Sequence, residues 1–422
     1  AQAIDAIVAV LASAGNSRAI LFTLVIGALI ATMEGSGGVK GFVAWLEDRR
    51  WVDSPRRAQV LAWAVGLVIF IESNITVLVA GALARPLFDR YRISREKLAY
   101  LIDSTSAPIC MLIPLNAWGA YCLSLLGQLG VKDPMAVFVA SIPYNLYGLA
   151  AVALATVTVF VPLHIGPMRR AQERSAGGEV LWPDAQPMVD TSLAEALQAE
   201  SGVAPRARNM ILPVFTMVAM MPLSLWITGK GELAKGSGST SVLWSVLAAL
   251  ALSWLLLLVQ RAFSVEQLTR VALKGAGALL PLATILLLAL ALGNVAKALG
   301  TGRFVAQATA GTLPPPAYLP LLFAVAAGIA FSTGTSWGTF AIMLPIAVPV
   351  AQTLGLPPAP FVAASLSGGV FGDHASPISD TTIVSSMAAA TDHVDHVRTQ
   401  LPYALLAGAV AAAGFALVGL TL

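Results

Sequence analysis

Charged residues are scarce in this sequence. Asp, Glu, Lys and Arg make up 11% of the 422 residues, whereas hydrophobic residues make up 57% and the mean hydropathy is +0.79. A water-soluble globule of this size needs more polar surface, so the composition excludes that class of protein. Ionisable groups are costly at membrane depth, so the few that interrupt apolar stretches point to function.

Cysteine is almost absent, and the usual cofactor motifs are missing. Cys110 and Cys122 lie in one apolar stretch at a helical separation of roughly 18 Å, which is too far for a disulfide. The sequence has no cysteine cluster, dinucleotide-binding fingerprint or haem motif, and it predicts no cofactor. The glycines at 35–38 lack the Gly-Lys-Ser/Thr ending of a phosphate-binding loop, which argues against an ATP-driven pump. The net charge of +3 includes no basic arm suited to nucleic acid.

Long apolar runs are present instead. Leu, Ala and Val dominate them without period-two alternation, which predicts helices and argues against a membrane β-barrel. The sequence therefore predicts an all-α polytopic protein in a lipid bilayer. Runs long enough to cross about 30 Å of hydrocarbon include 19–33, 134–162, 209–228, 241–259, 275–299 and 401–422.

Positive charge is distributed unevenly among the predicted loops. Five segments hold 19 of the 25 Lys and Arg residues, namely 35–57, 85–97, 163–208, 260–274 and 391–400. Loops rich in Lys and Arg stay on the cytoplasmic side of a membrane. We therefore place these segments in the cytoplasm and the other loops outside, and we expect a bacterial inner membrane.

Two apolar segments are expected to enter and leave the bilayer on one face. Residues 58–84 lie between basic loops, which predicts a re-entrant hairpin with the polar tip 72–76 (Glu-Ser-Asn-Ile-Thr). Residues 317–350 have flanks almost free of basic residues, and their polar middle 332–339 predicts a second hairpin that enters from outside. Such tips are tolerated only inside protein or a water-filled cavity.

Each hairpin is followed by a helix that a similar polar string interrupts. The strings are 103–109 (DSTSAPI) and 373–378 (DHASPI), in which Pro and small residues break the helix and free backbone carbonyls. Two copies in opposite orientation are typical of inverted-repeat transporters, whose site lies at the repeat interface near the midplane. We predict a first repeat over 1–162, a cytoplasmic connector over 163–208 with one short amphipathic helix, and a second repeat over 209–422.

The two predicted repeats differ at their beginnings. Predicted helices at 209–228 and 241–259 precede the hairpin unit of the second half, whereas the first half begins at Ala1 without an initiating Met. We expect a longer native reading frame that supplies two further helices before Ala1.

Oxygen-bearing side chains gather at the hairpin tips and helix breaks. A hard cation such as Na⁺ prefers oxygen ligands, which unwound carbonyls and Ser, Thr, Asn and Asp side chains provide. The alternative is that these hydroxyls only satisfy interrupted backbone, although that would not require matching strings in both halves. The expected cation- or substrate-binding residues are Ser73, Asn74, Thr76, Ser104, Thr105, Ser106, Thr333, Thr335, Ser336, Ser376, Ser379, Asp380 and Thr381, of which Asn74, Ser106, Ser336 and Asp380 are the expected Na⁺ ligands.

Ionisable groups at the same places decide whether protons also move. The candidate proton carriers are Glu72, Asp103, Asp373 and His374. Competition between Na⁺ and H⁺ for one carboxylate would by itself give antiport. The structural alternatives are a Glu72 carboxylate that accepts backbone hydrogen bonds and a His374 ring that donates to a carbonyl. The string 392–396 places two His at i and i+3, but we favour a helix-capping role over metal binding.

Several of these strings resemble one known family. Similar motifs in the NhaC family of Na⁺/H⁺ antiporters correspond to residues 94–100, 103–108, 333–339, 372–383 (GDHASPISDTTI) and 392–403 (DHVDHVRTQLPY). The similarity covers most of the chain apart from the connector. It implies a non-enzymatic Na⁺/H⁺ exchanger of the wider ion-transporter superfamily, with scaffold and transport domains, elevator-type alternating access and often a homodimer.

The first hairpin tip departs from the family pattern. Antiporter members often carry paired aspartates there, whereas this chain has Glu72-Ser73-Asn74, and its Ser-Asn-x-Thr string resembles Na⁺-coupled carboxylate transporters. The alternative function is therefore Na⁺- or H⁺-coupled transport of a small organic acid or amino acid. A more remote alternative is an intramembrane hydrolase using Ser376 and His374, which would leave the paired strings without a role and has no apparent oxyanion motif.

Overall fold

The computed structural model is helical throughout the part of the chain that it describes. Those residues contain no β-strand and one isolated bridge, between Pro187 and Asp392. The predicted all-α class is therefore confirmed. The chain divides into two compact units. The described residues are 2–48, 52–68, 70, 73–114, 116–187, 204–232, 236–300, 304, 307 and 313–422.

Several helices have the length and composition of membrane spans. In the described ranges, four helices qualify: α2 (Ala14–Gly35), α13 (Arg208–Thr228), α14 (Gly238–Val259) and α22 (His393–Gly419). They cover four of the predicted runs, and the chain is a multi-pass membrane protein. A fifth span results if α9 (Pro134–Ser141), η1 (Ile142–Tyr144) and α10 (Leu146–Phe160) are counted together, although a bend of 49° separates η1 from α10.

Two predicted spans are interrupted, each next to residues that weaken a helix. Pro143 within η1 cannot donate a backbone hydrogen bond, and it lies directly before the bend that divides 134–162. The predicted run 275–299 is divided between α15 (Val265–Ala278) and α16 (Leu280–Ala298). Gly275 and Gly277 precede this second break, and glycine costs about 1 kcal/mol relative to alanine inside a helix.

Unit 1 comprises residues 1–51, 132–136 and 191–292. Its helices α1 (Gln2–Ala12), α2, α3 (Gly38–Asp48), α13, α14 and α15 include three of the four long apolar spans. Helix α2 packs against α14 and α15, and α13 pairs with α14. A capping box formed by Ser264 and Gln267 fixes the start of α15.

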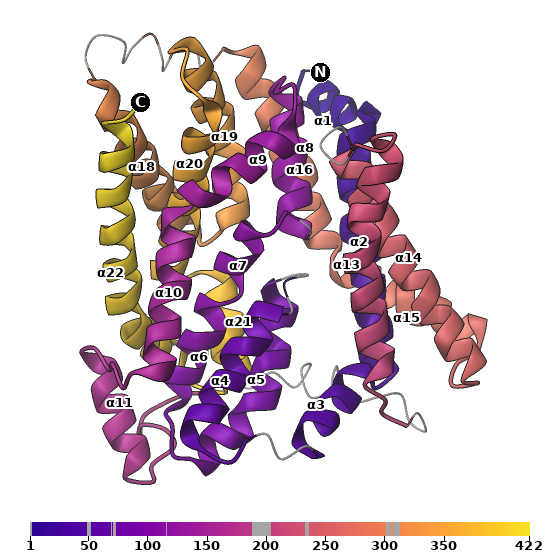
Figure 1. Cartoon of the computed structure of the whole chain (residues 1–422), viewed down its shortest axis with the longest axis vertical. Coiled ribbons are helices and arrows are strands. Elements are labelled where there is room, and N and C mark those ends of the chain that lie inside the picture. Colours follow the sequence, from indigo (N-terminus) through magenta and orange to yellow (C-terminus); the bar gives the residue numbers. More distant parts are fainter. Residues whose placement is uncertain are drawn as a thin grey trace. The chain divides into compact units, whose positions relative to one another are not determined.

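Unit 2 comprises residues 52–131, 137–190 and 293–422, and it contains both predicted hairpins and both predicted helix breaks. Helix α22 is about 40 Å long, so its two ends serve to locate the other helices of the unit. In Figure 1, α4, α5, α6 and α11 lie at the end where α22 begins, and α18 and α19 lie at the end where it finishes. Besides α10 and α22, the helices are α4 (Pro55–Val68), α5 (Ser73–Arg90), α6 (Arg95–Ser104), α7 (Ala107–Leu112), α8 (Ala117–Gln128), α11 (Pro167–Ala176), η3 (Pro315–Ala317), α18 (Tyr318–Thr333), α19 (Ser336–Thr353), α20 (Pro358–Ala375) and α21 (Asp380–Ala389).

The basic loops of unit 2 share one end of α22. Asp392 at the start of α22 accepts a hydrogen bond from the Gln186 amide at 2.8 Å, and α11 packs against both α22 and α6. At the other end, Gly419 lies against Pro316, directly before α18. The arrangement of unit 2 agrees with the expectation that the segments 85–97, 163–187 and 391–400 face one side of the membrane.

Both helix breaks occur at the predicted strings. One predicted hairpin packs against each break, α4–α5 against the first and α18–α19 against the second. Helix α6 ends at Ser104 before α7, and α20 ends at Ala375 before α21. Gly66 in α4 lies so close to Thr105 that a Cβ would overlap the Thr105 hydroxyl. Gly334, which turns α18 into α19 at a φ of 65°, lies against the Ile378 carbonyl in the same way. Only glycine fits these two contacts without displacement.

Candidate functional site

Asp103 lies at the first helix break and is held by the second half of the chain. Its carboxylate accepts hydrogen bonds from Thr382 Oγ1 at 3.2 Å and Ser385 Oγ at 3.1 Å, both on α21. Gln400 Nε2 on α22 donates to it at 2.6 Å. All four residues are buried. A predicted proton-carrier candidate is thus surrounded by three neutral donors.

Thr382, Ser385 and Gln400 are site residues that the sequence did not predict. Ser385 lies one turn after Thr382, so helical spacing places both hydroxyls on the same face of α21. Gln400 lies one turn after His396, at the end of the polar first part of α22. Polar residues at these spacings were the available signal, but their common partner Asp103 is visible only in the fold.

Asp373 lies near the second helix break, and its partner comes from the second hairpin. Ser336 Oγ, at the start of α19, lies 2.6 Å from Asp373 Oδ2 and 3.3 Å from the Gly369 carbonyl. Asp373 is fully buried, and its other oxygen Oδ1 has no hydrogen-bond partner among the described residues. The start of α19 also directs the positive end of the helix dipole toward this region. The result is a compact set of oxygen atoms around one buried carboxylate.

His374 faces a third element, α10. Its Nδ1 lies 3.1 Å from the Tyr147 hydroxyl, and both side chains are buried. Its Nε2 has no hydrogen-bond partner in the described part of the chain. His374 and Tyr147 line a narrow cavity with Tyr100, Gln400 and other residues, and this cavity leaves essentially no room for a water molecule.

Four further predicted hydroxyl residues donate to a backbone carbonyl. These bonds match the alternative in which a hydroxyl satisfies backbone at an interrupted or bent helix. For Ser376, the partner is the Phe331 carbonyl rather than His374, and the intramembrane hydrolase alternative would need those two side chains together. The four are Thr105, Ser106, Thr333 and Ser376, at 2.7, 3.0, 2.8 and 2.8 Å from their acceptor carbonyls.

The residues that begin α21 form a separate turn. Ser379 caps the helix by accepting from the Thr382 amide at 3.3 Å, and its hydroxyl lies 3.2 Å from that of Thr381. Asp380 is exposed, and one of its oxygens accepts from the Thr381 amide at 2.8 Å. The Asp380 amide reaches the Gly334 carbonyl at 3.3 Å, which joins this turn to the tip of the second hairpin.

For the remaining predicted residues, the structure gives burial and position where they lie within the described range. Ser104 is buried and lines the cavity beside His374, and Thr335 is partly buried between α18 and α19. Ser73 and Thr76 are buried in the first turn of α5. Glu72 and the side chain of Asn74 lie outside the described residues, so the predicted Na⁺ site at Asn74, Ser106, Ser336 and Asp380 stays a prediction.

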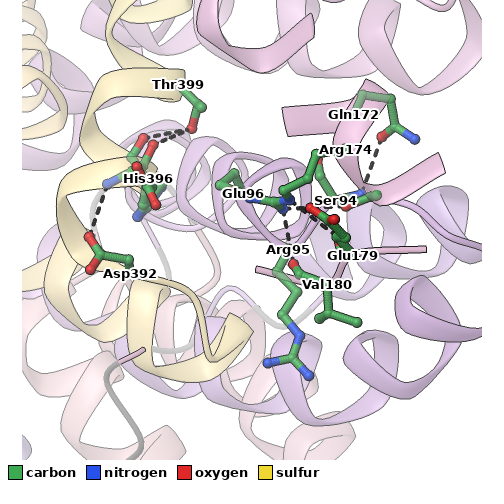
Figure 2. A network of polar contacts seen from close by, with 12 residues as sticks. Ser94, Arg95, Glu96, Gln172, Arg174, Glu179, Val180, Asp392, His396 and Thr399 are labelled. Carbon is green, nitrogen blue, oxygen red and sulfur yellow. Dashed lines mark hydrogen bonds and ion pairs between the residues drawn. The ribbon is translucent and has the colours of Figure 1, made fainter. Parts of the chain in front are cut away.

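The connector is anchored by a buried ion pair. Arg174 on α11 donates to both carboxylate oxygens of Glu96 on α6, at 2.8 and 2.9 Å, and the two side chains are 3% and 0% exposed. Figure 2 shows this pair together with Asp392 and His396 at the start of α22. The predicted short helix of the connector is therefore confirmed as α11. It is fixed to the helix that ends near Asp103.

The string 392–396 caps a helix, as predicted. Asp392 Oδ1 accepts from the amides of Val394 and Asp395 at 2.8 and 3.2 Å. Within the described ranges, no group of three or more His, Cys, Asp or Glu side chains has the arrangement of a metal site. Cys110 and Cys122 are buried and form no disulfide with each other, as their spacing predicted.

The sequence matches known transport proteins. A family model described as the Na⁺/H⁺ antiporter family matches residues 128–420. An uncharacterized protein of Haemophilus influenzae is 32% identical over 426 residues, which cover 96% of this chain and 79% of that protein. The arginine/ornithine antiporter ArcD of Halobacterium salinarum is 34% identical over 29% of this chain and 25% of its own length. The malate-2H⁺/Na⁺-lactate antiporter of Bacillus subtilis is 33% identical over 25% of this chain and 22% of its own length.

Proposed function

Since the chain belongs to the Na⁺/H⁺ antiporter family and is a secondary transporter, we propose that it exchanges Na⁺ for H⁺ across the bacterial inner membrane. The single observation that carries this proposal is the pair of buried carboxylates, Asp103 and Asp373, each beside an interrupted helix and bonded to hydroxyls from another helix. Buried carboxylates inside a membrane protein are costly and mark ion or proton pathways.

Asp373 is the proposed Na⁺ ligand. Its free oxygen, the Ser336 hydroxyl and the Gly369 carbonyl bring together the kinds of oxygen that a hard cation prefers. Na⁺ and H⁺ would compete for the Asp373 carboxylate, so release of one would favour binding of the other. Asp103 is the second proposed proton carrier, and its hydroxyl partners Thr382 and Ser385 can each reverse their role from donor to acceptor when the carboxyl is protonated.

Alternating access between two inverted repeats is the proposed route. In unit 2, the pair α4–α5 and the break between α6 and α7 are followed along the chain by the pair α18–α19 and the break between α20 and α21. The outer ends of the two pairs lie at opposite ends of α22, which supports an inverted relation. We propose that unit 2 is the mobile transport domain of an elevator, that unit 1 is the scaffold, and that the protein works as a homodimer.

The proposal is tested by proton flux in proteoliposomes. Purified protein is reconstituted with an internal pH dye, the membrane potential is clamped, and a Na⁺ gradient is imposed. Wild-type protein should move protons opposite to Na⁺, and Asp373→Asn should abolish this flux because the amide cannot exchange a proton or offer a full negative charge to a cation. Thr353→Val is the matched control, since Thr353 only bonds the Pro349 carbonyl on the same helix and should leave flux intact.

Two outcomes would contradict the assignment in different ways. Unchanged flux in Asp373→Asn, with normal gel filtration and thermal unfolding, would remove Asp373 from the mechanism. No flux in the wild type, in a preparation that still shows a Na⁺-dependent thermal shift, would favour the alternative function instead.

The alternative is coupled transport of a small organic acid or amino acid. One observation favours it: two partial relatives are an arginine/ornithine antiporter and a malate-2H⁺/Na⁺-lactate antiporter. Thermal-shift measurements with those four solutes, each with and without Na⁺, would identify a solute that binds only with the cation.

A further inference from the structure

Two histidines at the start of α22 share a single serine hydroxyl. His393 Nδ1 lies 3.0 Å and His396 Nδ1 lies 2.9 Å from Ser386 Oγ on α21. The same hydroxyl lies 2.8 Å from the Thr382 carbonyl. Ser386 and His396 are fully buried, and His393 is partly exposed. None of these groups has a role in the proposed exchange of Na⁺ and H⁺.

The far nitrogen of each imidazole has a partner that can only accept. His393 Nε2 lies 2.7 Å from the Pro377 carbonyl, so it must carry a hydrogen. His396 Nε2 lies 3.0 Å from Gln400 Oε1. The orientation of the Gln400 amide follows from its Nε2 group, which faces two acceptors, the Asp103 carboxylate at 2.6 Å and the His374 carbonyl at 3.1 Å. His396 Nε2 must therefore carry a hydrogen as well.

Hydrogen counting then identifies a missing proton. When both imidazoles are neutral, each Nδ1 is an acceptor, and the Thr382 carbonyl is a third acceptor around Ser386 Oγ. The Thr382 carbonyl also accepts the helix hydrogen bond inside α21, but one hydroxyl hydrogen cannot serve both Nδ1 atoms, and an acceptor left unsatisfied in this largely buried cluster is costly. A proton added to either Nδ1 turns that nitrogen into a donor to Ser386 Oγ, which leaves the hydroxyl hydrogen for one of the other two acceptors.

We propose that His393, Ser386 and His396 form a proton-binding site that holds one proton shared between the two imidazoles. The site lies at the end of unit 2 that carries the basic loops, where His393 is accessible. Gln400 connects it to Asp103, so a charge on the cluster acts on the carboxylate across one amide side chain. The bound proton sets the pH range in which Asp103 takes part in transport, and this second part of the inference rests on the proposed function.

Charges of both signs surround the cluster. Two ion pairs on the neighbouring helices neutralise themselves, Asp89 with Arg95 and Glu96 with Arg174. The other Asp, Glu, Lys, Arg and His side chains on the packed elements are Arg85 and Arg90 on α5, Lys97 and Asp103 on α6, Arg169, Arg170 and Glu173 on α11, Asp373 and His374 on α20, Asp380 on α21, and Asp392, Asp395 and Arg398 on α22. Asp392 bonds only to backbone amides in the described hydrogen bonds, and Asp103 only to neutral donors. Asp103, which Gln400 links to His396, and Asp392, which caps α22, therefore have no cationic partner in the described hydrogen bonds.

Histidine NMR tests the proton site directly. The chain has four histidines, so carbon-labelled histidine in nanodisc-embedded protein gives a small set of signals, and His164→Gln and His374→Gln assign two of them. We expect the His393 and His396 signals to change together with one midpoint as the first proton is taken up. Ser386→Ala should separate the two midpoints by at least about one pH unit, because strongly interacting groups titrate as a pair. Independent titration in the wild type, or midpoints unchanged by Ser386→Ala, would overturn the proposal.

A flux measurement tests the functional part and separates it from the proposed exchange. In proteoliposomes, His393→Gln should move the pH midpoint of Na⁺-driven proton flux by at least about one unit to lower pH, because one imidazole alone holds the shared proton less tightly. His164→Gln is the control and should leave the midpoint unchanged. Flux with an unaltered midpoint in His393→Gln would overturn the link to Asp103. Absence of flux in the wild type would overturn the proposed exchange, and the NMR titration would then decide the proton site alone.

Discussion

Removal of Arg174 should release the connector from α6. The Arg174 guanidinium forms two hydrogen bonds to Glu96, two to the Glu179 and Val180 carbonyls at 3.2 and 2.9 Å, and a cation–π contact with Trp182 at 4.7 Å. In Arg174→Met, the side-chain volume is largely retained while all these donors are lost. The two carbonyls belong to exposed residues and can bond to water instead, so the loss is concentrated at the buried carboxylate of Glu96.

The expected magnitude follows from that carboxylate. Leaving one member of a buried ion pair without its partner costs about 3–5 kcal/mol. The matched control is Arg169→Met on the same helix, because Arg169 pairs with Glu173 but both side chains are largely exposed, at 74% and 63%. Such an i,i+4 pair contributes about 0.3–0.5 kcal/mol. Adding Glu96→Gln to Arg174→Met removes the buried charge and should restore much of the loss.

Hydrogen exchange of α11 is the appropriate assay, since it reports the opening of this segment whether the rest of the protein unfolds or not. At 1.36 kcal/mol per tenfold change, Arg174→Met should lower the protection of the α11 amides roughly 100- to 5,000-fold. Arg169→Met should change it about twofold. Equal effects of the two variants would refute the reasoning, because the ion pair would then contribute no more when buried than when exposed.

Two further predictions concern the hairpin tips. Glu72→Gln should abolish Na⁺-driven proton flux at an unchanged unfolding temperature if Glu72 carries the proton, and normal flux would exclude that role. Gly334→Val should lower both the unfolding temperature and the flux, at a cost of at least about 1–3 kcal/mol, because φ is 65° and a Cβ would overlap the Ile378 carbonyl. Gly328→Val on α18 is the matched control, since a Cβ at Gly328 meets no atom within 4 Å, and equal losses in the two variants would contradict the steric argument.

The helix breaks could be predicted from the sequence because their causes are local. Pro108 near the start of α7 and Pro377 between α20 and α21 cannot donate backbone hydrogen bonds, and Gly334 adopts a left-handed turn that few other residues tolerate. Such causes depend on only a few neighbouring residues, so they can be recognised in the sequence. The same argument explains why the divisions at Pro143 and Gly277 were visible in principle but were hidden by the surrounding apolar runs.

The contacts inside the site could not be predicted, because they depend on packing between distant helices. Asp103 was a predicted candidate, but none of its partners Thr382, Ser385 and Gln400 was predicted. The Na⁺ site expected at Ser336 and Asp380 stays a prediction, and the described side-chain hydrogen bonds join Ser336 to Asp373 and Asp380 to the Thr381 amide. Which side chain meets which carboxylate is set by the packing of α6, α21 and α22, and a single sequence holds no direct record of it.

The bonding of Asp103 also constrains how the protein is made. Its three partners follow it in the chain by 279, 282 and 297 residues. At a synthesis rate of about 5–20 residues per second, roughly 15 to 60 s pass between the synthesis of Asp103 and that of its partners. During this interval the first half must hold a carboxylate in or near the bilayer without the groups that later surround it. Insertion of α6 is therefore expected to be completed only when α21 and α22 arrive, so the order of assembly is imposed by one acidic residue.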